Sequence, residues 1–347
     1  MKLPHHVAGV SLALALAACS GAQNGATPMT LPNGNSGGSG GGGTHYSVPA
    51  QQLTGAHTAT SALILVANEG AGLGGTISEF GEAANGNIAP SSVIPTHGGQ
   101  PLAIAFSSKE GIGIADGNID SPGKFGVETF ALATGDFLTG ISCFPKPSQT
   151  NAVAFDSKGQ LFVSTALPEG GRAVEVFAPG ANGCATPKRT ISDEGGLTID
   201  SNNLLYVADS KTATIDIFPA GSSTMQAQIG GSNTRLVAPG TVAVDASLNV
   251  YVFDTKTATV SEFAAGATGN VAPIRTIAGA NTGLDGGNGF SFGLAVSKTS
   301  GEIFVSNPGS NAILGFATTA SGNVAPIQTI GGAATMLSDP LGITVTQ

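Results

Sequence analysis

The chain has 347 residues, a formal net charge of −9 and only 10% charged residues. Its 52 glycines are about twice ordinary usage, and together with abundant Thr, Val and Ile they favour β structure over helix. The 13 Lys and Arg residues form no basic stripe, so we expect no binding to nucleic acid, which depends on basic contacts to phosphate.

The first residues predict export. Lys2 gives a short positive end, and the apolar run of residues 7–18 is too short to span a bilayer, as is typical of a signal peptide. The run ends in Leu-Ala-Ala-Cys at 16–19, which resembles the lipobox of bacterial lipoproteins. That resemblance implies cleavage before Cys19 and lipid on Cys19, which would anchor the protein to a membrane of the bacterial cell envelope. Cleavage at an ordinary secretory site is the alternative.

A flexible tether is expected to follow the signal peptide. Ser20 favours the outer membrane, because an aspartate at this position is the enterobacterial signal for the inner membrane. The segment is rich in Gly, Ser, Thr, Asn and Pro and cannot bury an apolar face, so its root-mean-square span would be ~35 Å. We therefore expect a signal peptide at 1–18, a tether at 19–60 and a folded domain at 61–347.

The folded domain is expected to consist of repeats. Residues 204–218 read LLYVADSKTATIDIF, which predicts two short strands around a polar turn. Related segments recur every 41 to 53 residues and share a closing Phe, namely Phe80, Phe130, Phe177, Phe218, Phe263 and Phe316. One further strand precedes each hairpin and another follows the Phe. A period of this size with four strands per unit predicts a β-propeller.

The ends of the repeat region predict how the ring closes. The region starts on the second strand of a unit, at 63–67, and stops on a first strand, at 340–345. We expect these two strands to pair and complete one blade. The prediction is an all-β, six-bladed propeller of four-stranded antiparallel blades.

The segments LLYVADSKTATIDIF and NAVAFDSKGQLFVS resemble the NHL-repeat propellers, which are related in fold to the SMP-30/gluconolactonase group. The resemblance covers about residues 61–347 and implies the fold. It carries little about function, because propellers host many chemistries.

Polar residues begin the middle turn of five repeats, namely Asn68, Asp116, Asp209, Asp254 and Asn307, and Thr165 stands there in the sixth. At the mouth of a central channel, these oxygens could hold Ca²⁺ or another divalent cation. The resemblance adds that the SMP-30 group binds a catalytic divalent metal at this end through Glu, Asn and Asp. The favoured interpretation is simpler, since Asp and Asn start turns by hydrogen bonding to their own backbone.

Two cysteines, Cys143 and Cys184, remain beyond Cys19. An exported chain meets oxidising surroundings, so the two could form a disulfide between neighbouring blades. The alternative is two free thiols that behave as small hydrophobic side chains. The sequence does not distinguish the two, because a disulfide needs a close Cβ approach.

No catalytic constellation emerges from the sequence, and His97 is the one histidine of the repeat region. The favoured function is a monomeric, lipid-anchored propeller of the cell envelope, at the outer membrane, that binds protein or glycan. One alternative is a metal-dependent, lactonase-like hydrolase that uses the polar ring. Another is a structural envelope protein without a ligand.

Overall fold

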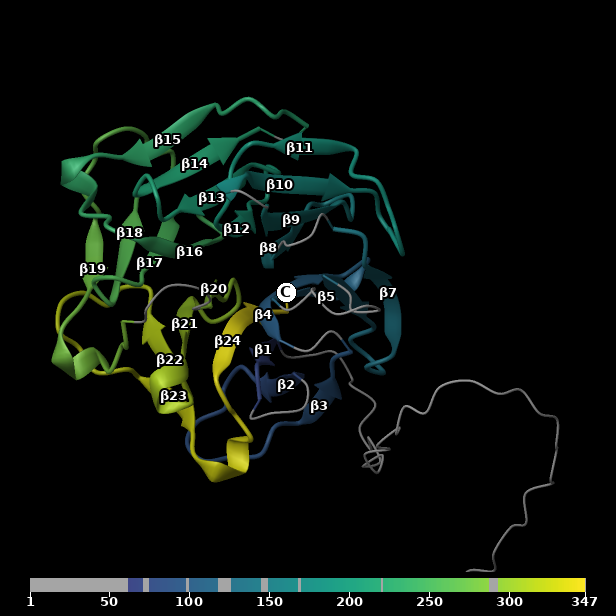
Figure 1. Cartoon of the computed structure of the whole chain (residues 1–347). Helices are drawn as coiled ribbons and strands as arrows, with labels where there is room; N and C mark the ends of the chain where they lie inside the picture. The colour runs from purple at the N-terminus through teal and green to yellow at the C-terminus, as the bar shows by residue number, and fades with distance from the viewer. Residues whose placement is uncertain are drawn as a thin grey trace, which may run out of the picture. The chain divides into compact units, whose positions relative to one another are not determined.

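The computed structural model of the protein describes residues 62–70, 75–97, 100–117, 126–144, 149–167, 170–219, 221–286 and 293–346. These residues form six four-stranded antiparallel sheets arranged as blades around an axis, so the predicted β-propeller is confirmed (Figure 1). No helix among them is long and apolar enough to span a membrane. The predicted signal peptide, the tether and Cys19 lie outside the described residues.

Each blade runs from an inner strand at the axis to an outer strand at the rim. Blade one contains β24 (Pro340–Val345), β1 (Leu63–Asn68), β2 (Thr76–Gly81) and β3 (Ser92–Pro95). Blade two contains β4 (Pro101–Ser107), β5 (Gly111–Asp116), β6 (Val127–Phe130) and β7 (Phe137–Ile141). Blade three contains β8 (Gln149–Phe155), β9 (Leu161–Ala166), β10 (Arg172–Phe177) and β11 (Arg189–Ile191).

The other three blades follow the same order. Blade four contains β12 (Gly196–Ile199), β13 (Leu205–Asp209), β14 (Thr214–Phe218) and β15 (Ala227–Gly230). Blade five contains β16 (Pro239–Val244), β17 (Val250–Asp254), β18 (Thr259–Phe263) and β19 (Arg275–Ile277). Blade six contains β20 (Leu294–Val296), β21 (Glu302–Asn307), β22 (Ala312–Ala317) and β23 (Gln328–Gly331). Short 3-10 helices are η2 (Ser232–Thr234), η3 (Ala280–Thr282), η4 (Pro308–Ser310) and η5 (Ala333–Thr335).

The ring closes as the sequence predicts. β24, from the end of the chain, pairs antiparallel with β1 and becomes the inner strand of blade one, with Leu65 opposite Thr344. The Leu63 N–H also donates to Thr346 Oγ1 at 2.8 Å. The two ends of the repeat region are therefore joined by a strand pair.

The core lies between neighbouring blades. The six repeated Phe side chains stand at or next to the last residue of the third strands, and each is at most 5% exposed. Between blades five and six, for example, Tyr251 and Phe253 pack in one cluster with Leu294 and Phe316. Full burial of such a side chain stabilises a fold by about 1.5–3 kcal/mol, which explains why the Phe recurs.

A repeated contact covers the outer edges of several blades. Gly269, between β18 and β19, bridges in parallel to Ile229 on the outer strand of blade four. The next residue, Asn270, accepts the Asn233 N–H through Oδ1 at 2.7 Å. Asn323 and Asn87 make the same contact to Asn281 and Ala334, also at 2.7 Å. We call this contact the Asn clasp, and it shields strand edges that would otherwise be free to pair with other chains.

A disulfide lies at the corresponding place between blades two and three. There Gly183 bridges in parallel to Ile141, and Cys143 and Cys184 are joined, with their Cα atoms 4.7 Å apart. The covalent link thus accompanies a blade contact of the same kind as the Asn clasp.

Replacing Gly279 with alanine tests the Asn clasp. Gly279 has φ of 115°, and an added Cβ would lie 2.6 Å from Asn323 Oδ1. We expect Gly279→Ala to lower the free energy of unfolding by about 2–3 kcal/mol in urea titrations, since backbone strain and loss of the clasp combine. Gly266→Ala is the control, because Gly266 also has positive φ, 72°, but an added Cβ meets nothing within 4 Å. Equal losses in the two variants would show that the clasp contributes nothing.

Candidate functional site: the central cavity

The six inner strands surround a cavity of about 1120 Å³. Ligand pockets usually measure roughly 300–1,000 Å³, so this cavity has room for a substantial ligand. Each inner strand stands at the end of its sheet, and small residues such as Ala103, Ala152 and Thr241 are frequent on the wall. A strand edge presents backbone N–H and C=O groups, so the wall offers hydrogen-bond donors and acceptors.

Apolar side chains stand where the inner strands finish, and the charged residues Asp156 and Asp200, each the next residue of the chain after an inner strand, also line the cavity there. The inner strands end, at or next to their last residue, in a side chain that lines the cavity, namely Phe106, Phe155, Ile199, Val244, Val296 and Val345. We call these six residues the apolar collar. The opposite end, where the inner strands begin, is polar and lies beside the turns between the second and third strands.

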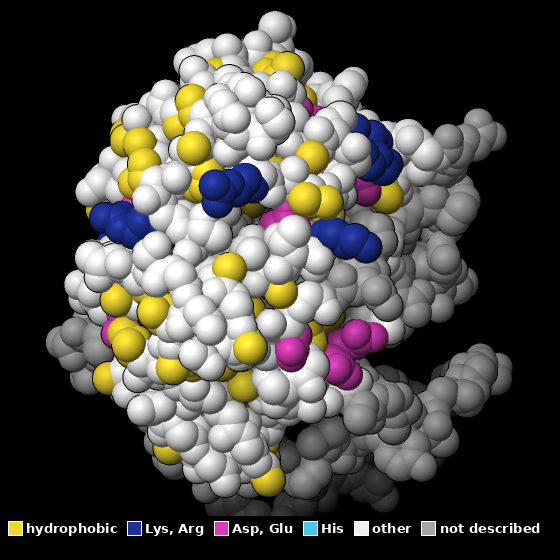
Figure 2. All heavy atoms as spheres, turned by 90° about the vertical axis from the view of Figure 1, so that its left-hand side faces the viewer, with side chains coloured by type: hydrophobic (Ala, Val, Ile, Leu, Met, Phe, Trp, Pro, Cys, Tyr) yellow, Lys and Arg dark blue, Asp and Glu magenta, His cyan; other side chains and the backbone are white. Residues whose placement is uncertain are grey.

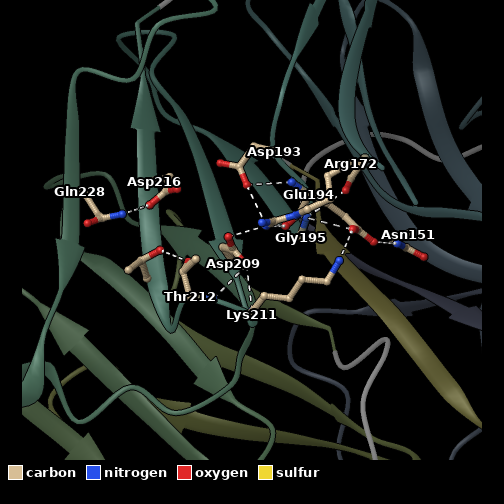
Figure 3. A network of polar contacts seen from close by, with 12 residues as sticks. Asn151, Arg172, Asp193, Glu194, Gly195, Asp209, Lys211, Thr212, Asp216 and Gln228 are labelled. Carbon is tan, nitrogen blue, oxygen red and sulfur yellow. Dashed lines mark hydrogen bonds and ion pairs between the residues drawn. The ribbon is translucent and has the colours of Figure 1, made fainter. Parts of the chain in front are cut away.

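A charged network forms the polar wall between blades three and four (Figure 3). Arg172, at the start of β10, pairs with Asp209, at the end of β13, and its Nη2 lies 3.2 Å from Asp193 Oδ1. Glu194 accepts hydrogen bonds from Asn151 Nδ2 at 2.8 Å and Lys211 Nζ at 3.4 Å. Four separate segments of the chain therefore meet at this wall.

Burial and the neighbouring charges shift the pKa values of two acidic residues in this network, Asp193 and Asp209. Burial raises the pKa of the Asp193 carboxyl to about 7, against the hydrogen bond from the Glu194 N–H, and the negative charges of Asp216 and Asp209 add to the rise. Burial alone would raise the pKa of Asp209, but the hydrogen bonds from Arg172, Thr212 and Lys211 and the charge of Arg172 together outweigh it, and the pKa is lowered. The same acids raise the pKa of Arg172 although burial opposes this. Asp209 and Arg172 are therefore a stable ion pair, while Asp193 changes charge near neutral pH.

Replacing Asp193 with asparagine is expected to change how stability depends on pH. The pKa of Asp193 in the fold lies above its ordinary value of about 4, so its contribution is fully present below pH 4 and is lost as pH rises through 7. Relative to Asp193→Asn, the wild type should lose on the order of 1 kcal/mol per pH unit between about pH 4 and 7. Urea titrations across this range measure the difference. The exposed Asp339 gives the control Asp339→Asn, and parallel curves for wild type and Asp193→Asn would contradict the assignment.

Three carboxylates of this region could in principle share a cation. Oxygens of Asp193, Asp209 and Asp216 all lie within 4.8 Å of one another, and hard cations prefer such ligands. Arg172 already binds two of the three, and Gln228 Nε2 donates to Asp216 Oδ1 at 2.8 Å. The guanidinium therefore takes the position that a metal ion would need.

The residues of the predicted polar ring lie at the expected turns, but they do not converge. Of the five, Asp209 lines the cavity. Asp254 accepts the N–H groups of Val237 at 2.6 Å and Ala238 at 2.8 Å, and Asn307 accepts that of Asp285 at 2.8 Å.

The other two members of the ring are buried within blades one and two. Asn68 is 1% exposed and donates to Ser78 Oγ at 2.9 Å, and Asp116 is 0% exposed. The ring members stand at the ends of second strands, one strand away from the axis, which explains why most of them face their own turns and loops.

Sequence reasoning missed five residues of the network, namely Asn151, Arg172, Asp193, Glu194 and Lys211. The sequence does contain a signal for these residues, because charged residues are rare in this chain. The Asp-Glu pair at 193–194 directly precedes a first strand, and Arg172 directly follows the Gly-Gly of a middle turn. In a propeller these two places lie at the same end.

Comparison with known proteins supports the fold. No protein-family model matches the sequence, and a search of curated proteins finds no match. Three solved structures show the likeness. A protein of unknown function from Bacteroides caccae is 10% identical with a TM-score of 0.58, over 83% of this chain and 100% of that one.

The second structure is a nidogen/laminin complex, which is 14% identical with a TM-score of 0.60, over 82% of this chain and 98% of that one. The third is a periplasmic gluconolactonase of Pseudomonas aeruginosa, which is 14% identical with a TM-score of 0.54, over 83% of this chain and 99% of that one. At these identities the likeness concerns the β-propeller fold alone.

Proposed function

We propose that this protein is a binding module of the bacterial cell envelope that holds a polar ligand in the central cavity of its propeller. The observation that carries the proposal is the open cavity of about 1120 Å³, lined by six strand edges and by a charged network at one end. Backbone groups on a strand edge bind polar chains such as polypeptide or glycan without needing a specific side chain.

The rim of the propeller is the other surface on which a ligand could bind, and its side chains favour the cavity as the binding site. On the face in Figure 2, basic, acidic and hydrophobic side chains are scattered among uncharged ones. Among the exposed hydrophobic residues, Ile274 at 52% and Ile327 at 58% stand on successive blades, and Phe137 at 39% and Leu138 at 48% form one adjacent pair on β7. Scattered side chains of this kind are ordinary for a protein surface.

Lipid on Cys19 is part of the proposal, because it would tether the propeller at the outer membrane. Radiolabelled palmitate fed to cells that express the protein should appear in the wild type and be lost in Cys19→Ala. Label that persists in Cys19→Ala would contradict lipidation at this residue.

Filling the cavity tests the binding function. Thr198 and Thr241 line the wall on β12 and β16. We expect full-length protein to capture ligands on glycan and peptide arrays, and Thr198→Trp and Thr241→Trp to lose them while keeping the wild-type melting temperature. Thr257→Trp, at an exposed turn position, is the control. Absence of any ligand on both arrays would favour the structural role instead.

A metal-dependent, lactonase-like hydrolase is the second candidate. The trio of Asp193, Asp209 and Asp216 favours it, as does the fold shared with a gluconolactonase. Arg172 weighs against it, because its guanidinium already binds two of these acids. A rise in the melting temperature of the wild type with Ca²⁺, Mg²⁺ or Zn²⁺, together with lactone hydrolysis, would establish this candidate over the first.

A further inference from the structure

The wall between blades three and four contains one donor and one acceptor that lack hydrogen bonds. Within the described part of the chain, Asn151 Oδ1 and Arg172 Nε are buried and make none. Both residues flank Glu194, which accepts from Asn151 Nδ2 at 2.8 Å and lies 3.8 Å from Arg172 Nε. Leaving such groups unpaired is costly, so they favour a partner that can both donate and accept.

A hydroxyl group has this double capacity, whereas a peptide N–H only donates and a peptide C=O only accepts. Lys211 adds further donors at the same wall, because its side chain is 58% exposed and its Nζ lies 3.4 Å from Glu194 Oε2. Of the charged network, two cations, Arg172 and Lys211, and two carboxylates, Glu194 and Asp209, line the cavity, whereas Asp193 pairs with Arg172 and is not a lining residue. This balance of charge suits an uncharged ligand rich in hydroxyl groups.

An aromatic surface continues the same wall. β8 begins near Asn151 and ends at Phe155, roughly 13 Å further along the strand at its usual rise. Phe155 and its neighbour Phe106 on β4 line the cavity and are partly exposed. An electron-rich ring face packs well against C–H groups, which a sugar ring presents on its flat side.

We infer that blade three carries a saccharide-binding site, in which Asn151, Arg172, Glu194 and Lys211 hold neighbouring hydroxyl groups and Phe155 packs against a sugar ring. This inference rests on the proposed function, since it names the ligand class of the same cavity. The ligand is a neutral oligosaccharide.

Titration calorimetry of the full-length protein with cellotetraose, maltotetraose and chitotetraose tests the site. At least one is expected to bind. Asn151→Ala should weaken that binding about fivefold and Lys211→Ala about tenfold, the effects of losing one neutral and one charged hydrogen bond. Phe155→Leu, which keeps an apolar side chain but removes the ring, should also weaken it. The exposed Lys188 lies outside the cavity, so Lys188→Ala is the matched control and should bind as the wild type does.

The outcomes separate this inference from the function on which it rests. Saccharide binding that is unchanged in Asn151→Ala and Lys211→Ala would overturn the assignment of the site. Binding of peptides but of no saccharide, blocked by Thr241→Trp, would overturn the ligand class and leave the binding function standing. Binding of neither class would overturn both. Circular dichroism melts of each variant show whether a loss of binding reflects a loss of folding.

Discussion

Replacing Arg172 with alanine is expected to destabilise the propeller by about 3 kcal/mol and to create a site for a divalent cation. The side chains of Asp209 and Asp193 are only 3% and 5% exposed, so removing their cation leaves charges buried without a partner. Breaking a buried ion pair in this way typically costs roughly 3–5 kcal/mol. The lower end applies because the Arg172 side chain is 24% exposed. Urea titrations measure the loss.

The cation should bind because three carboxylates remain within 4.8 Å of one another when the guanidinium is gone. Ca²⁺ at a hundred times its dissociation constant would restore about 2.7 kcal/mol to Arg172→Ala, while the wild type would not respond. Lys158→Ala, at an exposed position, controls for the loss of a positive charge. Equal stabilisation of wild type and variant by Ca²⁺ would contradict the view that Arg172 takes the place of a metal.

Deleting residues 340–347 is expected to abolish cooperative folding. The deletion removes β24 and with it Leu341, Ile343 and Val345, each at most 8% exposed. At about 1.5–3 kcal/mol for each buried side chain, the loss approaches the whole stability of an ordinary domain, roughly 5–15 kcal/mol. It also leaves β1 without one of its two strand partners.

Far-UV circular dichroism melts and size-exclusion chromatography test this deletion. We expect a broad transition and an expanded or aggregated species, whereas deletion of residue 347 alone should leave the wild-type melt. A synthetic peptide of residues 340–347 added to the truncated protein should restore part of the transition. A sharp melt near the wild-type temperature without the peptide would contradict closure of the ring by β24.

The fold could be predicted from the sequence because the six blades share the same physical problem. Each must fill the wedge between two sheets, so Phe263 has a counterpart in every other blade, and each needs a turn that Asp or Asn can begin. Repetition in the sequence follows directly from repetition in the packing. The pairing of β24 with β1 could be predicted as well, since the repeat region begins and ends on complementary parts of one blade.

The charged network could not be found in this way, because a site depends on what distinguishes one blade from the others. Arg172 and Glu194 each occur once and come from separate segments, so no period marks them. The repeated polar ring, in contrast, is marked by the period of the repeats. Its member Asp254 shows the reason for its recurrence, because its carboxylate accepts backbone N–H groups of its own turn and of the loop that leads into its blade.

Amide hydrogen exchange with and without ligand tests most directly the claim that the cavity is the binding site. The ligand would be the strongest binder found on the glycan and peptide arrays, added to the full-length protein. We predict slower exchange in the inner strands β8 and β12 at 149–155 and 196–199, and no change in the outer strands β19 and β23 at 275–277 and 328–331. Protection confined to the outer strands, with the inner strands unchanged, would contradict the claim and place the ligand on the rim of the propeller.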